Sequence, residues 1–111
     1  MPEATGSVER RRRYPRIDCP RGMLVAWQCG AQRDVSPVRS LSLGGMFIST
    51  KNPPAVGEIV KLLVDLPMGE LRARAIVRRS IPGKGMGIEF ISMLHGDRAR
   101  LHLMMKQFLR G

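Results

Sequence analysis

Two short stretches of this sequence carry residue types that can recognise a ligand. The first is Arg10-Arg11-Arg12-Arg13-Tyr14-Pro15-Arg16, which puts five guanidinium groups into seven residues. Adjacent like charges repel one another, and an anionic partner relieves that repulsion. Each guanidinium is a planar fork that pairs with a phosphate or a guanine edge and can stack on a ring. The alternative for such a charge run is a solvated, disordered terminal arm.

The second stretch is Ser40-Leu41-Ser42-Leu43-Gly44-Gly45. In an extended chain the hydroxyls of Ser40 and Ser42 project to the same side. The paired Gly44 and Gly45 permit positive φ angles and a close approach of a ligand to the backbone. Taken alone, the stretch is also compatible with an ordinary Ser/Gly turn.

Composition narrows the class of protein. A chain of 111 residues forms one small domain, and a net charge of +10 favours anionic partners such as nucleic acids, nucleotides, phosphates or an acidic membrane surface. Cys19 and Cys29 form no C-x-x-C pair, and the two histidines have no ligand spacing, so we expect reduced thiols, no metal and no cofactor. Scattered carboxylates argue against an enzyme. Without a transmembrane-length or signal-peptide apolar run, we expect a cytoplasmic protein that does not insert into membranes.

The hydrophobic pattern predicts a mostly β domain. Residues 1–18 are expected to be a flexible arm and residues 19–111 a small six-stranded antiparallel β-barrel with one C-terminal α-helix. Leu101, Met104, Met105 and Phe108 mark the apolar stripe of the helix, and Asp97 is its expected N-cap. Strands are expected over residues 23–27, 35–41, 45–49, 60–66, 71–77 and 86–90, the second being an edge or bulged strand because it contains Pro37.

Together the two stretches resemble the motifs of the PilZ domain, the bacterial receptor for cyclic di-GMP. That family carries R-x-x-x-R in an N-terminal arm, matched by Arg12 and Arg16, and [D/N]-x-S-x-x-G on the barrel, matched by Ser42 and Gly45. The order and spacing of the motifs and the Gly-Met-Gly-Ile-Glu-Phe segment at residues 85–90 fit as well. The resemblance extends from about residue 9 to the end of the chain.

The resemblance implies a switch without catalysis. Arg12 and Arg16 would read guanine O6 and N7, with Arg13 as phosphate or stacking support, and the residues from Ser40 to Gly45 would complete the site. Arg11 occupies the position that accompanies binding of an intercalated ligand dimer, which implies two ligands per domain. Ligand binding would order the arm on the barrel and signal to a partner protein, for which motility or type IV pilus machinery is the expected setting.

Ser40 departs from the family pattern, which has Asp or Asn at this position. A carboxylate or amide oxygen reaches the N1–H and N2–H₂ donors of guanine, whereas one short hydroxyl cannot do so bidentately. The loss is worth about 1.5–3 kcal/mol, or roughly tenfold to a hundredfold in affinity, which leaves micromolar binding. On this reasoning Ser40→Asp should tighten binding.

Two alternatives stay open. One is a degenerate PilZ domain that binds only proteins, which Ser40 supports and the intact arginine motif opposes. The other is a basic nucleic-acid-binding small β-barrel, for which the chain offers charge but few aromatics, so we expect no nucleic-acid partner. Arg72, Arg74 and Arg78 form a second basic stripe, which is read as a solvated outer face in preference to a nucleic-acid patch. Trp27 and Phe47 are expected in the core.

Overall fold

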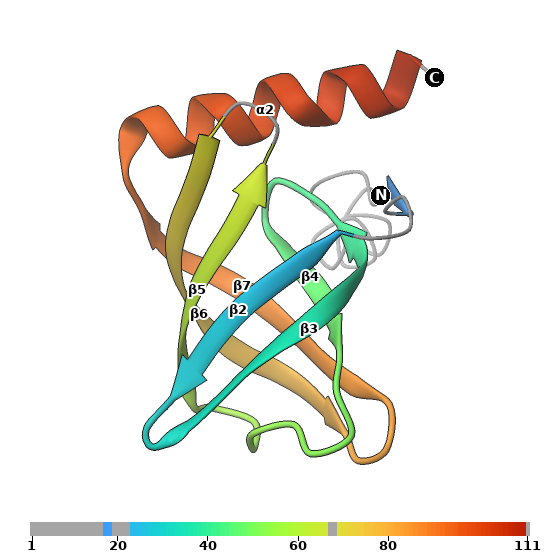
Figure 1. Ribbon diagram of the computed structural model, residues 1–111, viewed down its shortest axis with the longest axis vertical. Coiled ribbons are helices and arrows are strands. Elements are labelled where there is room, and N and C mark those ends of the chain that lie inside the picture. The colour runs from blue at the N-terminus through green and yellow to red at the C-terminus, as the bar shows by residue number, and fades with distance from the viewer. Residues whose placement is uncertain (1–16, 19–22, 67–68, 111) are drawn as a thin grey trace, which may run out of the picture.

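The computed structural model describes residues 17–18, 23–66 and 69–110, so the R-x-x-x-R motif lies outside the described residues. Within these ranges seven strands precede one helix. Figure 1 shows their arrangement. The strands are β1 (Ile17–Asp18), β2 (Leu24–Cys29), β3 (Gln32–Leu41), β4 (Gly45–Ser49), β5 (Ile59–Leu66), β6 (Gly69–Ile81) and β7 (Gly85–Met93), and the helix is α2 (His95–Arg110).

The strands close into the predicted six-stranded antiparallel barrel. Their order is β3-β2-β5-β6-β7-β4, and β4 pairs back onto β3. Strand β3 pairs with three other strands. Residues 32–37 pair with β2, and residues from Val38 onward pair with β4. The two residues of β1 pair with Ser40 and Leu41 of β3. The end of the predicted arm is thereby part of the sheet.

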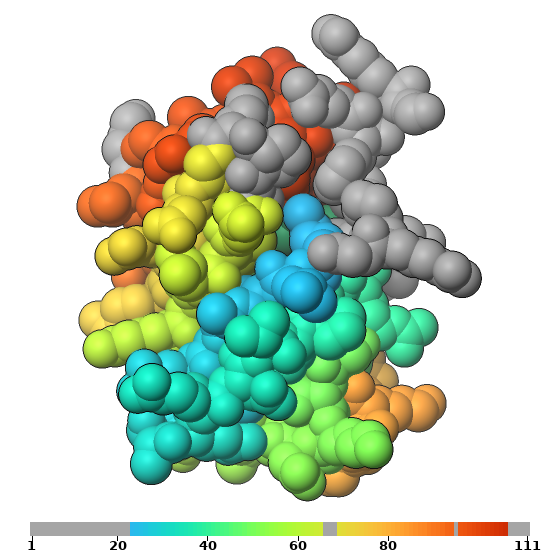
Figure 2. Space-filling view, in the orientation of Figure 1, coloured from blue at the N-terminus to red at the C-terminus, as the bar shows by residue number. Residues whose placement is uncertain are grey.

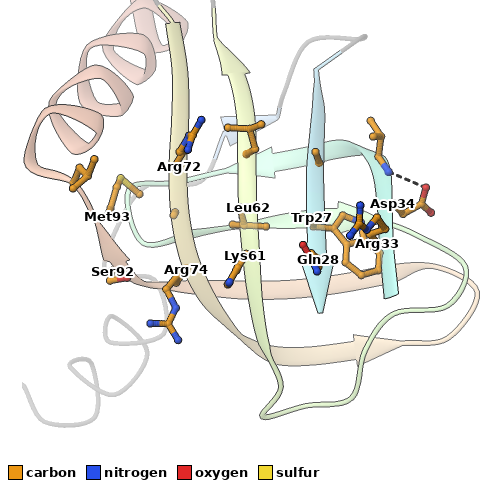
Figure 3. Close-up of a pocket in the computed structure, with 15 residues that line it drawn as sticks. Trp27, Gln28, Arg33, Asp34, Lys61, Leu62, Arg72, Arg74, Ser92 and Met93 are labelled. Carbon is orange, nitrogen blue, oxygen red and sulfur yellow. Dashed lines mark hydrogen bonds between the residues drawn. The ribbon is translucent and has the colours of Figure 1, made fainter. Parts of the chain in front are cut away.

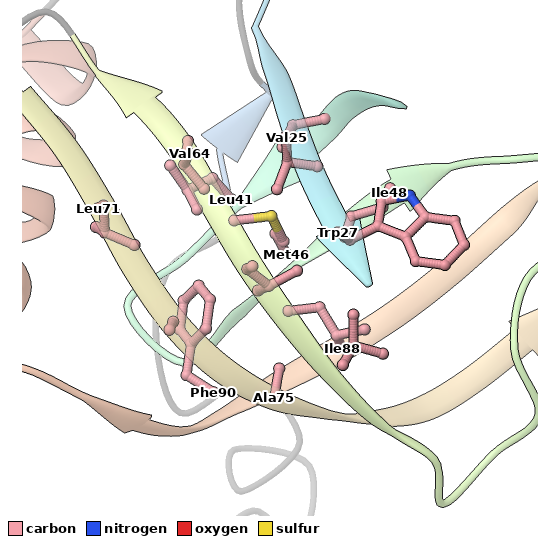
Figure 4. Close-up of a cluster of buried hydrophobic side chains, with 14 of the residues drawn as sticks. Val25, Trp27, Leu41, Met46, Ile48, Val64, Leu71, Ala75, Ile88 and Phe90 are labelled. Carbon is pink, nitrogen blue, oxygen red and sulfur yellow. The ribbon is translucent and has the colours of Figure 1, made fainter. Parts of the chain in front are cut away.

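Alternation of side chains along the strands builds the core. In β6, Leu71, Ala73, Ala75 and Val77 face inward between exposed residues, as the sequence pattern predicts (Figure 4). Burial of one such aliphatic side chain contributes about 1.5–3 kcal/mol. Among the described residues, nineteen buried hydrophobic side chains form one cluster. Besides these four of β6, its members are Val25 and Trp27 of β2, Val38 and Leu41 of β3, Met46 and Ile48 of β4, Val60, Leu62 and Val64 of β5, Met86, Ile88 and Phe90 of β7, and Leu101, Met104 and Met105 of α2.

Trp27 confirms its predicted place in this core. Its side chain is only 2% exposed. The indole N–H donates a hydrogen bond of 2.9 Å to the Ser36 hydroxyl of the neighbouring strand, so its polar atom is satisfied inside the barrel.

The helix covers one end of the barrel, as Figure 1 shows. It begins at His95, so Asp97 lies in its first turn and not at the predicted N-cap. The Asp97 carboxylate is buried and accepts a hydrogen bond of 3.1 Å from the Arg72 backbone N–H, while Arg100 donates to its other oxygen. Asp97 therefore ties α2 to β6. Helix α2, the helix of the described residues, lacks the length and apolar character needed to cross a bilayer.

Candidate ligand-binding site

The turn between β3 and β4 is organised by Ser42. Its backbone N–H donates to the Gly45 carbonyl at 2.8 Å. Its side-chain oxygen accepts from the N–H groups of Gly44 at 3.1 Å and Gly45 at 3.2 Å, and the hydroxyl contacts the Gly45 carbonyl at 3.4 Å. These bonds satisfy backbone groups that the turn would otherwise leave unpaired. Ser42 thus shapes the turn, a role that the family motif alone did not reveal.

Replacing Ser42 with alanine should destabilise the protein by about 1–3 kcal/mol, because the buried N–H of Gly45 and the part-buried N–H of Gly44 lose their acceptor. Urea unfolding followed by circular dichroism measures this change. Ser92→Ala removes an exposed hydroxyl from β7 and serves as the control, with an expected effect within about 0.5 kcal/mol. Equal unfolding midpoints for the two variants would contradict the structural role of Ser42.

The glycines of the turn act differently from the sequence-based expectation. None of the described glycines at positive φ lies in this turn. A Cβ built on Gly45 would lie 2.0 Å from the Ile88 carbonyl oxygen, so Gly45 is required by the close approach of β7. The Gly44 carbonyl accepts a hydrogen bond of 2.9 Å from the Phe90 N–H. The glycine pair therefore fastens the turn to β7.

A β-bulge in β3 directly precedes Ser40. The register of β3 and β4 shifts between Val38 and Ser40, so Arg39 is the extra residue and Ser40 pairs with Phe47. This irregularity lies after Pro37, which pairs with Leu24 of β2 inside the closed barrel, so the edge-strand alternative for this segment is wrong. Ser40 itself is 9% exposed.

Phe47 does not lie in the core, contrary to prediction. Met46 and Ile48 are buried on the inner face, whereas Phe47 is half-buried on the outer face. Its ring contacts β7, since a Cβ built on Gly85 or Gly87 would lie 2.8 Å or 3.8 Å from it. The alternation in β4 could have predicted the outward position of Phe47, because the residue between two inward-facing side chains of a strand points outward.

The β1–β3 ladder begins one residue after the R-x-x-x-R motif in the sequence and reaches the start of the serine–glycine stretch. It pairs Ile17 with Leu41 and Asp18 with Ser40. Arg16 immediately precedes Ile17 in the chain, so the second motif arginine adjoins the strand that pairs with the serine-bearing strand. Arg11, Arg12 and Arg13 lie outside the described residues. The structure thus places residues 17 and 18 beside Leu41 and Ser40.

Sequence reasoning missed two residues next to Ser40. Asp18 stands opposite it in the ladder, and exposed Arg39 precedes it in the bulge. The alternation could not signal either residue, because a two-residue strand is too short to show a period and a bulge interrupts one.

No group of three or more possible metal-ligating side chains occurs within the described ranges. Cys29 is a free thiol whose Sγ donates to Glu58 Oε1 at 3.5 Å. Burial raises the pKa of this thiol above its ordinary value, and the hydrogen bond and the negative charge of Glu58 raise it further. Cys29 therefore remains a protonated, weakly nucleophilic thiol near neutral pH.

Fold and turn together define a small β-barrel domain in which β1 pairs with the strand that leads into a serine–glycine turn. The family model for the PilZ domain matches residues 10–107. The chain belongs to the PilZ domain family. No individually curated protein matches the chain.

Three solved structures show the same fold. The Bacillus subtilis inhibitor of motility MotI/DgrA has a TM-score of 0.74 at 22% identity, covering 90% of this chain and 52% of its own. The MrkH–c-di-GMP complex from K. pneumonia has a TM-score of 0.72 at 16% identity, covering 89% and 52%. The PilZ domain with c-di-GMP of YcgR from Escherichia coli has a TM-score of 0.68 at 18% identity, covering 90% and 92%. The chain spans about half the length of MotI and MrkH.

Proposed function

We propose that this domain is a receptor for cyclic di-GMP that signals to a partner protein when its N-terminal arginines order on the barrel. The β1–β3 ladder is the observation that carries the proposal, because it pairs the two residues that follow R-x-x-x-R in the sequence with Leu41 and Ser40. Membership of the PilZ family and the ligand named in two of the similar structures support it.

The ligand chemistry suits the arginines. Cyclic di-GMP presents guanine O6 and N7 as adjacent acceptors, and an arginine fork pairs with both. In this proposal Arg12 and Arg16 read the guanines, and Arg13 neutralises a phosphate or stacks on a base. Arg11 supports a second, intercalated ligand, which gives two cyclic di-GMP molecules per domain.

In this proposal Asp18, the ladder partner of Ser40, is the residue that provides the acceptor which the family has at position 40. Residues directly opposite one another in an antiparallel ladder project to the same face, with their Cβ atoms about 4.5–5.5 Å apart. The register pairs Asp18 with Ser40, so a carboxylate-bearing residue is available at the cross-strand position. A carboxylate can accept from both guanine N1–H and N2–H₂.

The register changes which replacement of Ser40 should tighten binding most. Ser40→Asp would set two carboxylates opposite each other, because Asp18 is its ladder partner, and like charges there are unfavourable. Ser40→Asn supplies an amide oxygen without a charge and should improve the dissociation constant about tenfold. Calorimetric titration of both variants checks the order. Tighter binding by Ser40→Asp than by Ser40→Asn would contradict the role given to Asp18.

The output of the switch is a protein contact. Arginines that order on a ligand change the surface next to β1 and β3, and a partner can distinguish the two states. We place this partner in motility or pilus machinery. The description of MotI as an inhibitor of motility supports the setting.

Isothermal titration of cyclic di-GMP into the protein at physiological salt tests the proposal. We expect saturable micromolar binding with two ligands per chain. One ligand per chain would remove the role given to Arg11 while preserving the receptor. No binding up to high micromolar concentration would favour an adaptor without nucleotide. A random single-stranded oligonucleotide, titrated in parallel, should bind weakly; tight, salt-steep binding would favour the nucleic-acid alternative.

A further inference from the structure

A second surface feature lies on the outer face of the barrel. An open groove of about 950 Å³ crosses β3, β2, β5, β6 and the end of β7, and both basic and aliphatic residues line it (Figure 3). In the space-filling view the strands β3, β2 and β5 lie side by side across the front of the molecule (Figure 2). None of the residues from Ser40 to Gly45 lines this groove.

The ladder register aligns a cationic row in the groove, formed by Arg33, Lys61 and Arg74. Arg33 pairs with Gln28, Gln28 with Lys61, and Lys61 with Arg74, so the row runs across four strands, as Figure 3 shows. All three basic side chains are exposed. Lys61 and Arg74 are direct cross-strand partners, an arrangement that destabilises a sheet when both carry the same charge. An anion in the groove would relieve this repulsion.

The protein neutralises other basic residues of the same sheet. Arg78 pairs with Glu89 at 2.6 Å, for example. Among the described residues no carboxylate lies within 4.0 Å of the Lys61 or Arg74 charge. Asp34, the carboxylate that lines the groove, accepts a hydrogen bond from the Val35 N–H at 2.8 Å. The cationic row therefore offers its charge to an external partner.

An aliphatic row runs beside the cationic row, formed by Val35, Ala26 and Leu63, and it ends at the exposed Arg72, which pairs with Leu63. Ala26 pairs with Val35 on one side and with Leu63 on the other. This row lies two residues along the strands from the cationic row, a distance of about 7 Å. Val35 is 59% exposed, and Leu94 at the end of the groove is 70% exposed. A ligand of this groove must therefore bring apolar groups as well as negative charge.

Carboxylates stand on the far side of the aliphatic row. Asp65 of β5 pairs with Glu70 of β6, and both are exposed. They would repel negative charge placed over them. Glu70 lies 3.6 Å from Arg72, whereas along β5 the positive Lys61, the aliphatic Leu63 and the negative Asp65 follow one another. This order along β5 sets the orientation of an acidic ligand.

We propose that this groove binds an acidic, aliphatic segment of a partner protein, with carboxylates over the cationic row and aliphatic side chains over the aliphatic row. A phosphodiester chain makes no use of the aliphatic row. Single strands bind by stacking on exposed aromatics. Among the described residues Trp27 is the one aromatic residue that lines the groove, and it is buried. Charge and apolar surface together favour the protein segment.

Fluorescence anisotropy with a short labelled peptide of alternating Glu and Leu tests the proposal, with no nucleotide present. We expect saturable binding that weakens at least about tenfold in the Lys61→Glu, Arg74→Glu double variant. The matched control is Lys51→Glu with Lys84→Glu, which changes the net charge equally at exposed sites outside the groove and should bind like the wild type. Leu63→Ser tests the aliphatic row without a change of charge and should also weaken binding.

The single variant Lys61→Glu tests whether Lys61 and Arg74 repel each other across the strands. It creates an opposite-charge pair with Arg74, so the free protein should melt at a higher temperature while peptide binding falls. A peptide with Ala in place of Leu that binds equally well would overturn the proposal by reducing the groove to a charge patch. Absence of binding by the Glu/Leu peptide would also overturn it. The proposal would also be overturned if a random single-stranded oligonucleotide bound to the wild type and this binding were lost in the same double variant.

Discussion

The double variant Arg12→Ala, Arg16→Ala should lose all measurable binding of cyclic di-GMP. Each side chain is proposed to make charge-assisted, bidentate bonds to a guanine, and one such bond to a charged group contributes about 1.5–3 kcal/mol. Each single variant should therefore bind about tenfold to a hundredfold more weakly, and the pair would take micromolar affinity out of the measurable range. Isothermal titration of the wild type, both single variants and the double variant provides the comparison.

Arg10→Ala is the matched control for charge. It removes one guanidinium from the same run, outside R-x-x-x-R, and should change the affinity by less than about threefold at physiological salt because exposed charges are screened there. If Arg10→Ala costs as much as Arg12→Ala, general charge holds the ligand and the motif register has no special role. Unchanged circular dichroism spectra would show that the barrel is intact in all variants.

Gly45→Ala should cost about 3 kcal/mol of unfolding free energy, although it adds a single methyl group. The new Cβ would lie 2.0 Å from the Ile88 carbonyl oxygen and 3.0 Å from its carbon. These are backbone atoms of the β4–β7 ladder, so no side-chain rotation can remove the clash. Strand β4 must move away from β7, which also strains the hydrogen bond from Phe90 to Gly44. Urea unfolding measures the loss.

Gly96→Ala is the corresponding control. Gly96 lies in the first turn of α2, and a Cβ there meets no atom within 4 Å. Alanine has the higher helix propensity, so this variant should be as stable as the wild type or more stable by up to about 1 kcal/mol. Equal destabilisation at both positions would mean that glycine flexibility, and not the β4–β7 contact, explains the effect at Gly45.

The regular parts of the fold could be predicted from the sequence. The alternating Leu71, Ala73, Ala75 and Val77 determine which face of β6 is buried, and a register slip would bury the arginines between them. The same logic placed the six barrel strands and the helix, because each rests on a repeated local pattern.

The parts that position the candidate site could not be predicted in this way. Strand β1 has only two residues, so its existence depends on pairing with Ser40 and Leu41 far along the chain. The bulge at Arg39 likewise appears only when β3 and β4 are aligned. The need for glycine at position 45 comes from the carbonyl of Ile88, which no local motif records. Long-range pairing decides these features, whereas local periodicity decides the strands.

The pairing of β1 with β3 has a consequence for how the proposed receptor captures its ligand. Arg12 precedes Ile17 by five residues, so its Cα stays within about 18 Å of the ladder. Within that reach its local concentration at the site is on the order of millimolar or above, whatever the concentration of the protein. Closure of the arm on a bound nucleotide is then a unimolecular step. The equilibrium of arm closure would therefore not change with the concentration of the protein, and the response would depend on the level of the messenger.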